Sequence, residues 1–307
     1  MFEKPYFLVT TSDQRSWRKN IPLLFLGEWC IWNTEEDLKS FSNNQLCEPY
    51  GIKGGQRDKD QLYLEYFYEE LLVELTEALN DFHSTNYSKR FWRILVGTWL
   101  YRFTTILFNR WTTIHYAIEN YRITETIILD IPIEQTIPVD YLDFARMNRI
   151  GDWDHVIYGK ILRESTSVHC VSLPVTDTPK NQESFTFEPK FWLRKYIKRL
   201  WIQVSNMISF LLKRSNAGLI VASGLSKSQE KRLLISLNQI PFPRVTSDTP
   251  RSKIDLISRR GINLECTGKG FERFIRKLIP EQIPSCYLEG FNALTKEAEQ
   301  LPWPASP

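Results

Sequence analysis

The sequence predicts an α/β fold in which a mostly parallel sheet is covered by helices on both faces. Short apolar runs bounded by turn residues recur along the chain and are typical of buried strands. Longer segments between them carry apolar residues at every third or fourth position, which is the period of an amphipathic helix. The chain has 307 residues, of which 42% are hydrophobic and 24% charged, so it can bury a large core. Strands that alternate with helices in this way favour parallel pairing.

Four strands are predicted in the first half of the chain. They cover residues 6–11 (YFLVTT), 22–27 (PLLFLG), 125–132 (ETIILDIP) and 168–174 (VHCVSLP). The segment 43–60 is polar and contains three glycines, which predicts a loop.

Two long helices are predicted between the second and third of these strands. The first begins at Gln61 and ends near Phe82. The polar segment 84–90 interrupts the pattern and offers cap residues such as Ser88, after which a mostly apolar helix continues to about Tyr121. Residues 138–165 predict two shorter helices that break near Gly151.

The last third of the chain predicts further elements of both kinds. They are a basic amphipathic helix over 191–215, a strand over 217–224, a helix after the cap residue Ser226, a strand over 261–266, and helices within 268–280 and 286–301.

Composition excludes several classes of function. The formal net charge of +3 gives no bulk signal for a nucleic-acid binder. The five cysteines are scattered without a CxxC motif, which favours free thiols in a reducing cytoplasm, and the four histidines form no zinc pattern. The first residues lack an apolar segment of the signal-peptide kind, and no stretch of about 18 apolar residues predicts a membrane span.

The segment GEWC at the end of the second predicted strand is the first candidate site. Ligands of parallel sheets bind beyond the carboxyl ends of the strands. There Glu28 could act as a general base and Trp29 could wall a sugar or base. The alternative is a partly buried turn, and Cys30, which has no partner residue for catalysis, is expected to be a buried thiol.

The start of the second long helix is the next candidate. Arg90 and Arg93 share one helix face, and Asn86 and Ser88 add hydrogen-bond donors near the helix N-terminus, which favours a bound anion. Helix capping and salt bridges explain the same residues equally well. Gly97 within the helix indicates close packing or the close approach of a ligand.

Two other regions could carry chemistry. The loop after residue 132 contains Glu134 and Asp140, which could serve as catalytic carboxylates or could be ordinary surface acids. No Asp or Glu occurs between Pro189 and Gln229, and the basic residues of this stretch could meet a membrane, an anionic carrier or a nucleic acid, or could form a solvated helix face. The basic residues at the start of this helix are Arg194, Lys195, Lys198 and Arg199.

Long motifs of the chain resemble one family. FLGEWC, YLEYFYEELLVELTEALNDFH, NYSKRFWRILVGTWL and LFNRWTTIHYAIENY follow one another within residues 6–160, and the likeness returns near the end of the chain in LPWP. Together they resemble the surface-carbohydrate transferases of O-antigen biosynthesis clusters. This resemblance implies a Rossmann-like domain similar to the N-terminal half of a two-domain (GT-B) glycosyltransferase. Residues 1–300 would form that domain, with a helical insertion near 58–122, and 301–307 would lead to a second α/β domain.

The resemblance also implies an activity. A metal-independent bacterial enzyme would move a sugar from a nucleotide-activated donor to a glycan or lipid-linked acceptor, without a further cofactor. Glu28 is the expected base, with Glu134 and Asp140 as rivals. Trp29 and Trp99 would wall the acceptor, and Arg90 and Arg93 would hold an anionic group. The expected location is the cytoplasm, with a peripheral position at the inner membrane where lipid-linked acceptors reside.

Two other readings remain open from the sequence. One is a non-catalytic module that binds a membrane or a protein partner through the basic helix 190–214. The other, less favoured by the small net charge, is a nucleic-acid binder.

Overall fold

The computed structural model describes residues 5–18, 20–31, 44–52, 54–149, 151–175, 226–236, 249, 251–264 and 268–299. The chain divides into two compact units. The first comprises residues 1–178 and 250–290, and the second comprises residues 179–249 and 291–307.

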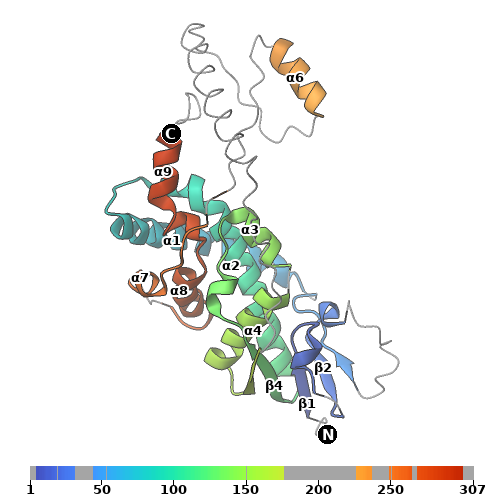
Figure 1. Ribbon diagram of the computed structural model, residues 1–307. Coiled ribbons are helices and arrows are strands. Elements are labelled where there is room, and N and C mark those ends of the chain that lie inside the picture. The colour runs from blue at the N-terminus through green and yellow to red at the C-terminus, as the bar shows by residue number, and fades with distance from the viewer. Residues whose placement is uncertain are drawn as a thin grey trace. The chain divides into compact units, whose positions relative to one another are not determined.

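The first unit contains a five-stranded parallel sheet (Figure 1), so the predicted α/β fold of the Rossmann-like type is confirmed. The strands are β1 (Tyr6–Val9), β2 (Leu23–Phe25), β3 (Gln45–Leu46), β4 (Ile123–Asp130) and β5 (His169–Pro174), and their order is β3-β2-β1-β4-β5. Four of them lie where apolar runs predict strands. The two-residue β3 falls in the segment predicted as a loop, because so short a strand leaves no periodic pattern.

Most residues of β1 and all residues of β2 are buried, as expected for a parallel sheet covered on both faces. Phe7, Leu8 and Val9 of β1 and Leu24 and Phe25 of β2 are at most 1% exposed. This explains why the strands appear in the sequence as continuous apolar runs and not as alternating patterns.

Two long helices form a hairpin between β3 and β4. Helix α1 spans Gln56–His83, five residues longer at its start than predicted, and α2 spans Lys89–Asn120. Ser88 caps α2 as expected, because its Oγ accepts a hydrogen bond from the Phe91 amide at 3.3 Å. A side chain at Gly97 would approach the Tyr68 hydroxyl to 2.7 Å, so this glycine permits close packing of the two helices.

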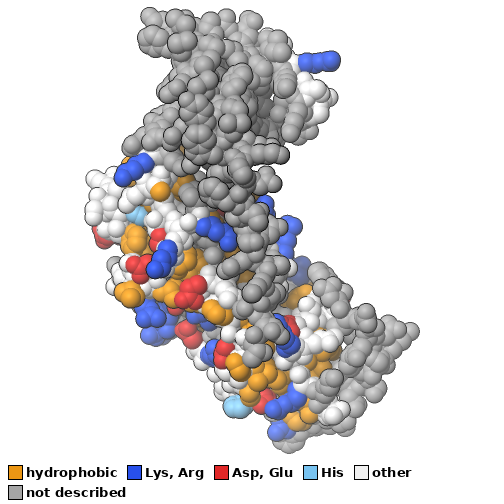
Figure 2. All heavy atoms as spheres, viewed as in Figure 1, with side chains coloured by type: hydrophobic (Ala, Val, Ile, Leu, Met, Phe, Trp, Pro, Cys, Tyr) orange, Lys and Arg blue, Asp and Glu red, His pale blue; other side chains and the backbone are white. Residues whose placement is uncertain are grey.

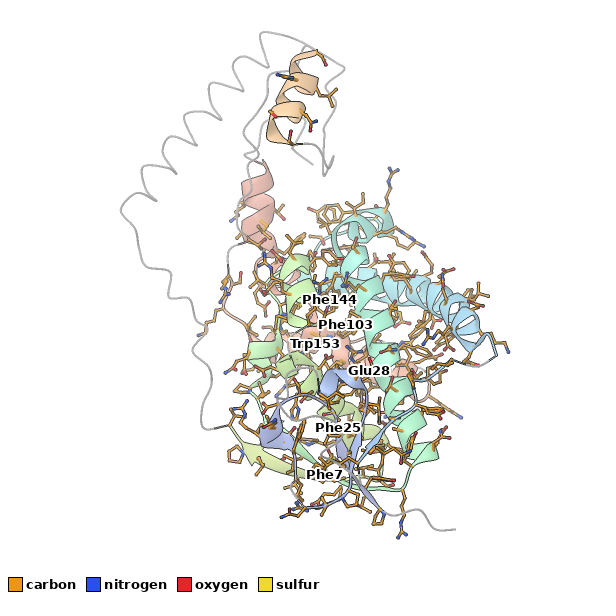
Figure 3. The ribbon with its side chains drawn as sticks, turned by 90° about the vertical axis from the view of Figure 1, so that its right-hand side faces the viewer. Phe7, Phe25, Glu28, Phe103, Phe144 and Trp153 are labelled. Carbon is orange, nitrogen blue, oxygen red and sulfur yellow. The ribbon has the colours of Figure 1, made fainter. Side chains whose placement is uncertain are left out.

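The connection from β4 to β5 contains two helices, as predicted. They are α3 (Tyr141–Met147) and α4 (Gly151–Ser165), preceded by the short 3-10 helix η4 (Ile133–Thr136). Helix α4 lies close against the sheet at Gly159, where a Cβ atom would approach Ile128 to 2.8 Å. Above the sheet edge the rings of Phe103, Phe144 and Trp153 pack edge to face (Figure 3).

The C-terminal part of the first unit packs back onto the helices. Helix α7 (Leu256–Arg260), helix α8 (Phe271–Gln282) and the 3-10 helix η5 (Ser285–Tyr287) form this part. The strand predicted over 261–266 is wrong in its described part, since residues 261–264 form no strand. Ile262 and Leu264 are buried, so their apolar character reflects packing into the core and not membership of the sheet.

Two buried arginines anchor this returning segment. Arg259 lies 2.7 Å from Glu289 and also donates to the carbonyl groups of Pro280 and Ile283. Arg276 of α8 donates to Glu70 at 2.6 Å and to Glu74 at 2.7 and 2.8 Å, and so ties α8 to α1. Buried guanidinium groups are tolerated here because carboxylates and carbonyl groups satisfy them.

The second unit contains helices α6 (Lys227–Ser236) and α9 (Phe291–Glu299), which match two predicted helices. Ser226 accepts a hydrogen bond from the Gln229 amide at 3.4 Å, as its predicted capping role requires. The helix predicted over 191–215 and the strand predicted over 217–224 lie outside the described residues.

Charges on the described surface are mixed. Figure 2 shows lysine and arginine side chains interspersed with acidic and apolar ones over the visible face of the first unit, in keeping with the small net charge. Among the helices in the described ranges, none is long and apolar enough to cross a membrane.

Candidate functional site

The strand order creates a topological switch point between β1 and β4. From β1 the chain continues to β2 and β3 on one side, and it returns to β4 and β5 on the other. The connections that leave β1 and β4 therefore diverge at their carboxyl ends, which is where open α/β sheets bind ligands. The segments after β1, β2 and β4 are consequently the first place to look for a site.

A buried histidine joins the two strands of the switch point. The Leu129 amide of β4 donates to His155 Nε2 at 2.8 Å, so this nitrogen must be the acceptor. The proton of the neutral ring is then on Nδ1, which lies 3.2 Å from the Thr11 hydroxyl after β1. Burial lowers the pKa of His155 to about 4, against the opposing charge of Asp13. The ring is thus a neutral brace at neutral pH.

The loop after β1 is ordered by a second set of polar contacts. Asp13 caps the 3-10 helix η1 (Gln14–Ser16), and Arg15 contacts its carboxylate through Nε and Nη2. Burial by itself would raise the pKa of Asp13, but the hydrogen bonds and charge of Arg15 hold that pKa below its usual value. The Trp17 indole donates to the Thr11 carbonyl at 3.0 Å and closes the loop.

The EWC segment forms the 3-10 helix η2 (Glu28–Cys30) directly after β2. The Trp29 indole folds back over Gly27 and donates to the Thr10 carbonyl at 2.9 Å. A Cβ atom at Gly27 would lie 2.1 Å from the Trp29 ring, so only glycine fits beneath it. The turn therefore has a structural reason for its Gly and Trp, and it links the ends of β1 and β2.

Glu28 is exposed at the start of this turn. Figure 3 shows it beyond the carboxyl end of β2, toward the cluster of Phe103, Phe144 and Trp153. Its carboxylate makes no hydrogen bond or ion pair with other described residues. Of the sequence-predicted residues, Glu28 and Trp29 are the two that the fold places together near the switch point.

Arg110 of α2 braces the same turn from behind. Its guanidinium lies 5.8 Å from the centre of the Trp29 ring and 5.7 Å from that of Tyr158, and it pairs with Asp154 at 2.8 Å. The side chains of Arg110 and Asp154 are only 20% and 14% exposed. Burial raises the pKa of Asp154 despite the opposing charge of Arg110. The sequence predicts only that Arg110 lies within the second long helix, and gives it no role.

Cys30 is fully buried, as predicted. Its sulfur lies 3.4 Å from the Val9 carbonyl, and burial raises its pKa to about 12. A thiol with so high a pKa is neither a nucleophile nor a ligand at neutral pH.

The two rival carboxylates follow β4. Glu134 is exposed on η4, whereas Asp140 is the N-cap of α3 and accepts a hydrogen bond from the Asp143 amide at 2.8 Å. Asp140 therefore has a structural task of its own. Asp130, at the end of β4, lies 3.4 Å from Arg163.

The start of α2 is not part of this edge. Arg93 forms a two-pronged ion pair with Glu69 of α1 at 2.5 and 2.6 Å, and Ser88 is occupied as the cap. Asn86 and Arg90 are exposed. Seventeen residues of helix separate Arg93 from Arg110, which corresponds to about 25 Å, so the structure does not bring this group to Glu28.

Trp99 lies in the core and not on a surface that a substrate could reach. It is 0% exposed, its ring stacks on Phe103 at 5.0 Å, and it also meets Phe144. Trp99 belongs to the apolar face of α2, and packing in the core explains the presence of this tryptophan without a ligand. The predicted basic contacts Arg194, Lys195, Lys198 and Arg199 lie outside the described residues.

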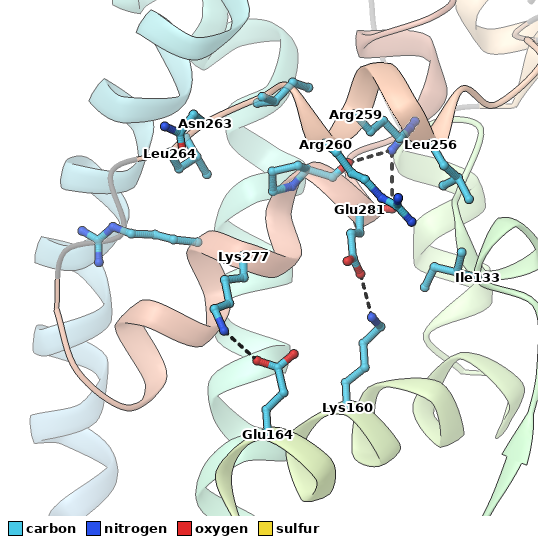
Figure 4. Close-up of a pocket in the computed structure, with 13 residues that line it drawn as sticks. Ile133, Lys160, Glu164, Leu256, Arg259, Arg260, Asn263, Leu264, Lys277 and Glu281 are labelled. Atoms are coloured by element: carbon cyan, nitrogen blue, oxygen red, sulfur yellow. Dashed lines mark hydrogen bonds and ion pairs between the residues drawn. The ribbon is translucent and has the colours of Figure 1, made fainter. Parts of the chain in front are cut away.

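A pocket of about 490 Å³ opens between α4, α7 and α8 (Figure 4). Two ion pairs cross it, Lys160 with Glu281 at 2.7 Å and Lys277 with Glu164 at 3.1 Å. Sequence reasoning missed this pocket, since α4 and the segment with α7 and α8 are about 90 or more residues apart in the chain and carry no local motif. Five of its lining side chains are basic, Lys160, Arg259, Arg260, Arg276 and Lys277, and two are acidic, Glu164 and Glu281.

The edge near the switch point can support acid–base chemistry. It offers the exposed carboxylate of Glu28 on a turn whose neighbours are fixed by hydrogen bonds and by a buried ion pair, and the exposed carboxylates of Asp130 and Glu134 lie at the end of β4 and on η4. In the described part of the chain, no group of three or more histidine, cysteine or acidic side chains is arranged to hold a metal ion.

Comparison with known proteins gives one result. Searches of curated proteins and of solved structures found no match. The family model described as LIC12162 family transferase matches residues 6–306, which is nearly the whole chain. The chain therefore belongs to the LIC12162 family of transferases.

Proposed function

We propose that this transferase is a glycosyltransferase of the GT-B type, which moves a sugar from a nucleotide-activated donor to a surface-polysaccharide acceptor. The observation that carries the proposal is the exposed carboxylate of Glu28 on a braced turn beside the switch point of a Rossmann-like sheet. Transferase family membership and the sequence resemblance to O-antigen cluster enzymes support it.

In this proposal Glu28 removes the proton from the acceptor hydroxyl as that oxygen attacks the anomeric carbon of the donor sugar. The bond to the leaving nucleotide phosphate breaks at the same carbon. A general base needs to be within reach of the substrate hydroxyl, and the exposed carboxylate of Glu28 is open to solvent. The half-buried Trp29 ring offers an apolar wall beside Glu28. Trp99, Arg90 and Arg93 take no part because of burial or distance.

The test compares Glu28→Gln with wild type in the full chain, with Glu134→Gln as the rival carboxylate and Glu77→Gln as the control on an exposed carboxylate elsewhere. Isothermal calorimetry against a panel of nucleotide sugars selects the donor, and release of the nucleotide is then followed with extracted lipid-linked glycans. We expect Glu28→Gln to lower turnover by about 100-fold or more while donor affinity and unfolding temperature stay unchanged. Turnover at the wild-type rate in Glu28→Gln, with loss in Glu134→Gln, would transfer the role to Glu134.

A further inference from the structure

The α1–α2 hairpin exposes an apolar surface that the core does not need. Leu62, Tyr66 and Val73 of α1 are 69%, 80% and 41% exposed, and Ile94 and Tyr101 of α2 are 71% and 42% exposed. We call these five residues the hairpin face. Single exposed apolar residues are ordinary, but a set aligned on neighbouring helices marks an interaction surface.

Helical spacing places these residues on one side of each helix. Leu62, Tyr66 and Val73 are four and seven residues apart, so they form a stripe on α1. The stripe lies opposite the buried residues Leu64, Leu71 and Leu75. Ile94 and Tyr101 are seven residues apart and form a matching stripe on α2.

Contacts between the helices make the two stripes one surface. The rings of Tyr68 and Tyr101 meet at 5.5 Å, and the ion pair of Arg93 with Glu69 bridges the helices between the stripes. The hairpin face is therefore continuous across the groove between α1 and α2.

The two helices carry opposite charge. Helix α1 contains eight acidic and two basic residues, whereas α2 contains five basic residues and one acidic residue. Arg110 of α2 pairs with Asp154 at the sheet edge, and Glu70 and Glu74 of α1 pair with Arg276, so these three charges are not counted for the hairpin surface. Exposed charges flank the hairpin face on both sides, with Glu65 and Glu77 on α1 and Lys89 and Arg90 on α2. A surface with an acidic half and a basic half is complementary to itself after a two-fold rotation.

We propose that the hairpin face docks a second copy of this chain. A two-fold axis along the groove would place the acidic α1 of each copy over the basic α2 of the other, with Tyr66 and Ile94 packed between them. The hairpin is about 40 Å long and about 20 Å wide, since its helices have 28 and 32 residues. One whole side of the hairpin, with the apolar residues and the charged flanks together, therefore covers about 800 Å² per copy, the size of a standard specific interface. The apolar residues themselves extend over about 17 Å of α1, from Leu62 to Val73. This proposal is independent of the catalytic one.

Sedimentation velocity of the full chain tests the proposal. We expect wild type to form a dimer with a Kd of about 1 μM or tighter. The double variant Tyr66→Glu with Ile94→Glu should weaken the dimer by about 100-fold, because it buries two carboxylates in the centre of the interface. Leu142→Glu is the matched control, since Leu142 is 63% exposed on α3, and it should leave the dimer intact.

Further variants and a vesicle-binding experiment distinguish this dimer from other uses of the hairpin face. Arg90→Glu should weaken the dimer several-fold and reduce its sensitivity to salt, and a dimer that this change strengthens would overturn the pairing of α1 with α2. Wild type that stays monomeric at about 100 μM would overturn the proposal, as would a dimer unaffected by the double variant. Monomeric wild type that floats with phosphatidylcholine–phosphatidylglycerol vesicles would identify a membrane as the occupant instead. All altered side chains are exposed, so each variant is expected to fold. The unfolding temperature of each variant checks this.

Discussion

Arg93 and Arg110 lie on the same helix and each pairs with a carboxylate, yet their surroundings differ. Arg93 is 41% exposed and Glu69 is 45% exposed, on the solvent side of the α1–α2 hairpin. Arg110 and Asp154 are mostly buried, and the Arg110 guanidinium lies over the aromatic rings of Trp29 and Tyr158. The comparison teaches that hydrogen-bond geometry alone does not show how much an ion pair contributes to stability. The pair with the better two-pronged geometry, Arg93 with Glu69, is the one exposed to solvent.

Removing Arg110 should have the largest effect. In Arg110→Met the carboxylate of Asp154 loses its partner within a mostly buried site, which should cost about 3–5 kcal/mol of unfolding free energy. The Trp29 ring also loses its cation, so the EWC turn should loosen. Chemical denaturation followed by tryptophan fluorescence measures the loss.

A second change sharpens this prediction. Adding Asp154→Asn to Arg110→Met removes the stranded charge, and should restore part of the lost stability. A double variant no more stable than Arg110→Met would show that packing of the guanidinium, and not its charge, is what matters.

His155 should make the sheet edge sensitive to acid. The pKa of this group falls from 6.5 in the unfolded chain to about 4 in the fold, so protonation favours unfolding. Above pH 6.5 the neutral His155 ring leaves the free energy of unfolding at its full value. As the pH falls from 6.5 to about 4, this group lowers the free energy of unfolding by up to about 3 kcal/mol, because the unfolded chain binds the proton more tightly than the fold does. The pH dependence of the denaturation midpoint measures this loss.

His155→Gln is the control for this window. The glutamine amide oxygen can still accept from Leu129, but the side chain does not titrate. We expect the slope between pH 6.5 and 4 to flatten in this variant. Asp13, whose pKa is lowered in the fold, affects stability in a different pH range. The stabilisation that its ionised carboxylate gives is lost only as the pH falls below 3.8. An unchanged slope in His155→Gln would assign the acid sensitivity to other groups.

Removing Arg93 should have the smallest effect. Arg93→Met breaks a solvated ion pair, which should cost at most about 1 kcal/mol and less at high salt. The same denaturation experiment as for Arg110→Met measures it. A loss equal to that of Arg110→Met would contradict the view that burial ranks the two pairs.

The sequence predicts much of the fold and less of the site. Apolar runs predict four of the five strands, and helical periodicity predicts α1, α2, α3 and α4. The capping role of Ser88 and the buried state of Cys30 also follow from local signals. The strand expected over 261–266 fails because an apolar run shows that residues are buried, but does not show against which element.

The candidate site depends on contacts between distant segments. The sequence indicates Glu28 and Trp29 because a carboxylate and an indole follow a predicted strand. It gives no sign that Arg110 of α2 braces Trp29, or that His155 reaches Thr11 across 144 residues of chain. It also groups Trp99 with Trp29 as a wall, although one lies in the core and the other at the sheet edge.

By itself the sequence determined the element types, the parallel character of the sheet and the likeness to transferases, because these depend on periodicity and on local motifs. Only the tertiary structure decided the order β3-β2-β1-β4-β5, and with it the switch point beside Glu28. It also decided which of two similar arginines is buried and which lies beside the exposed apolar face of the hairpin. The physical reason is that burial, and the strength of a charge pair with it, is a property of how distant segments pack.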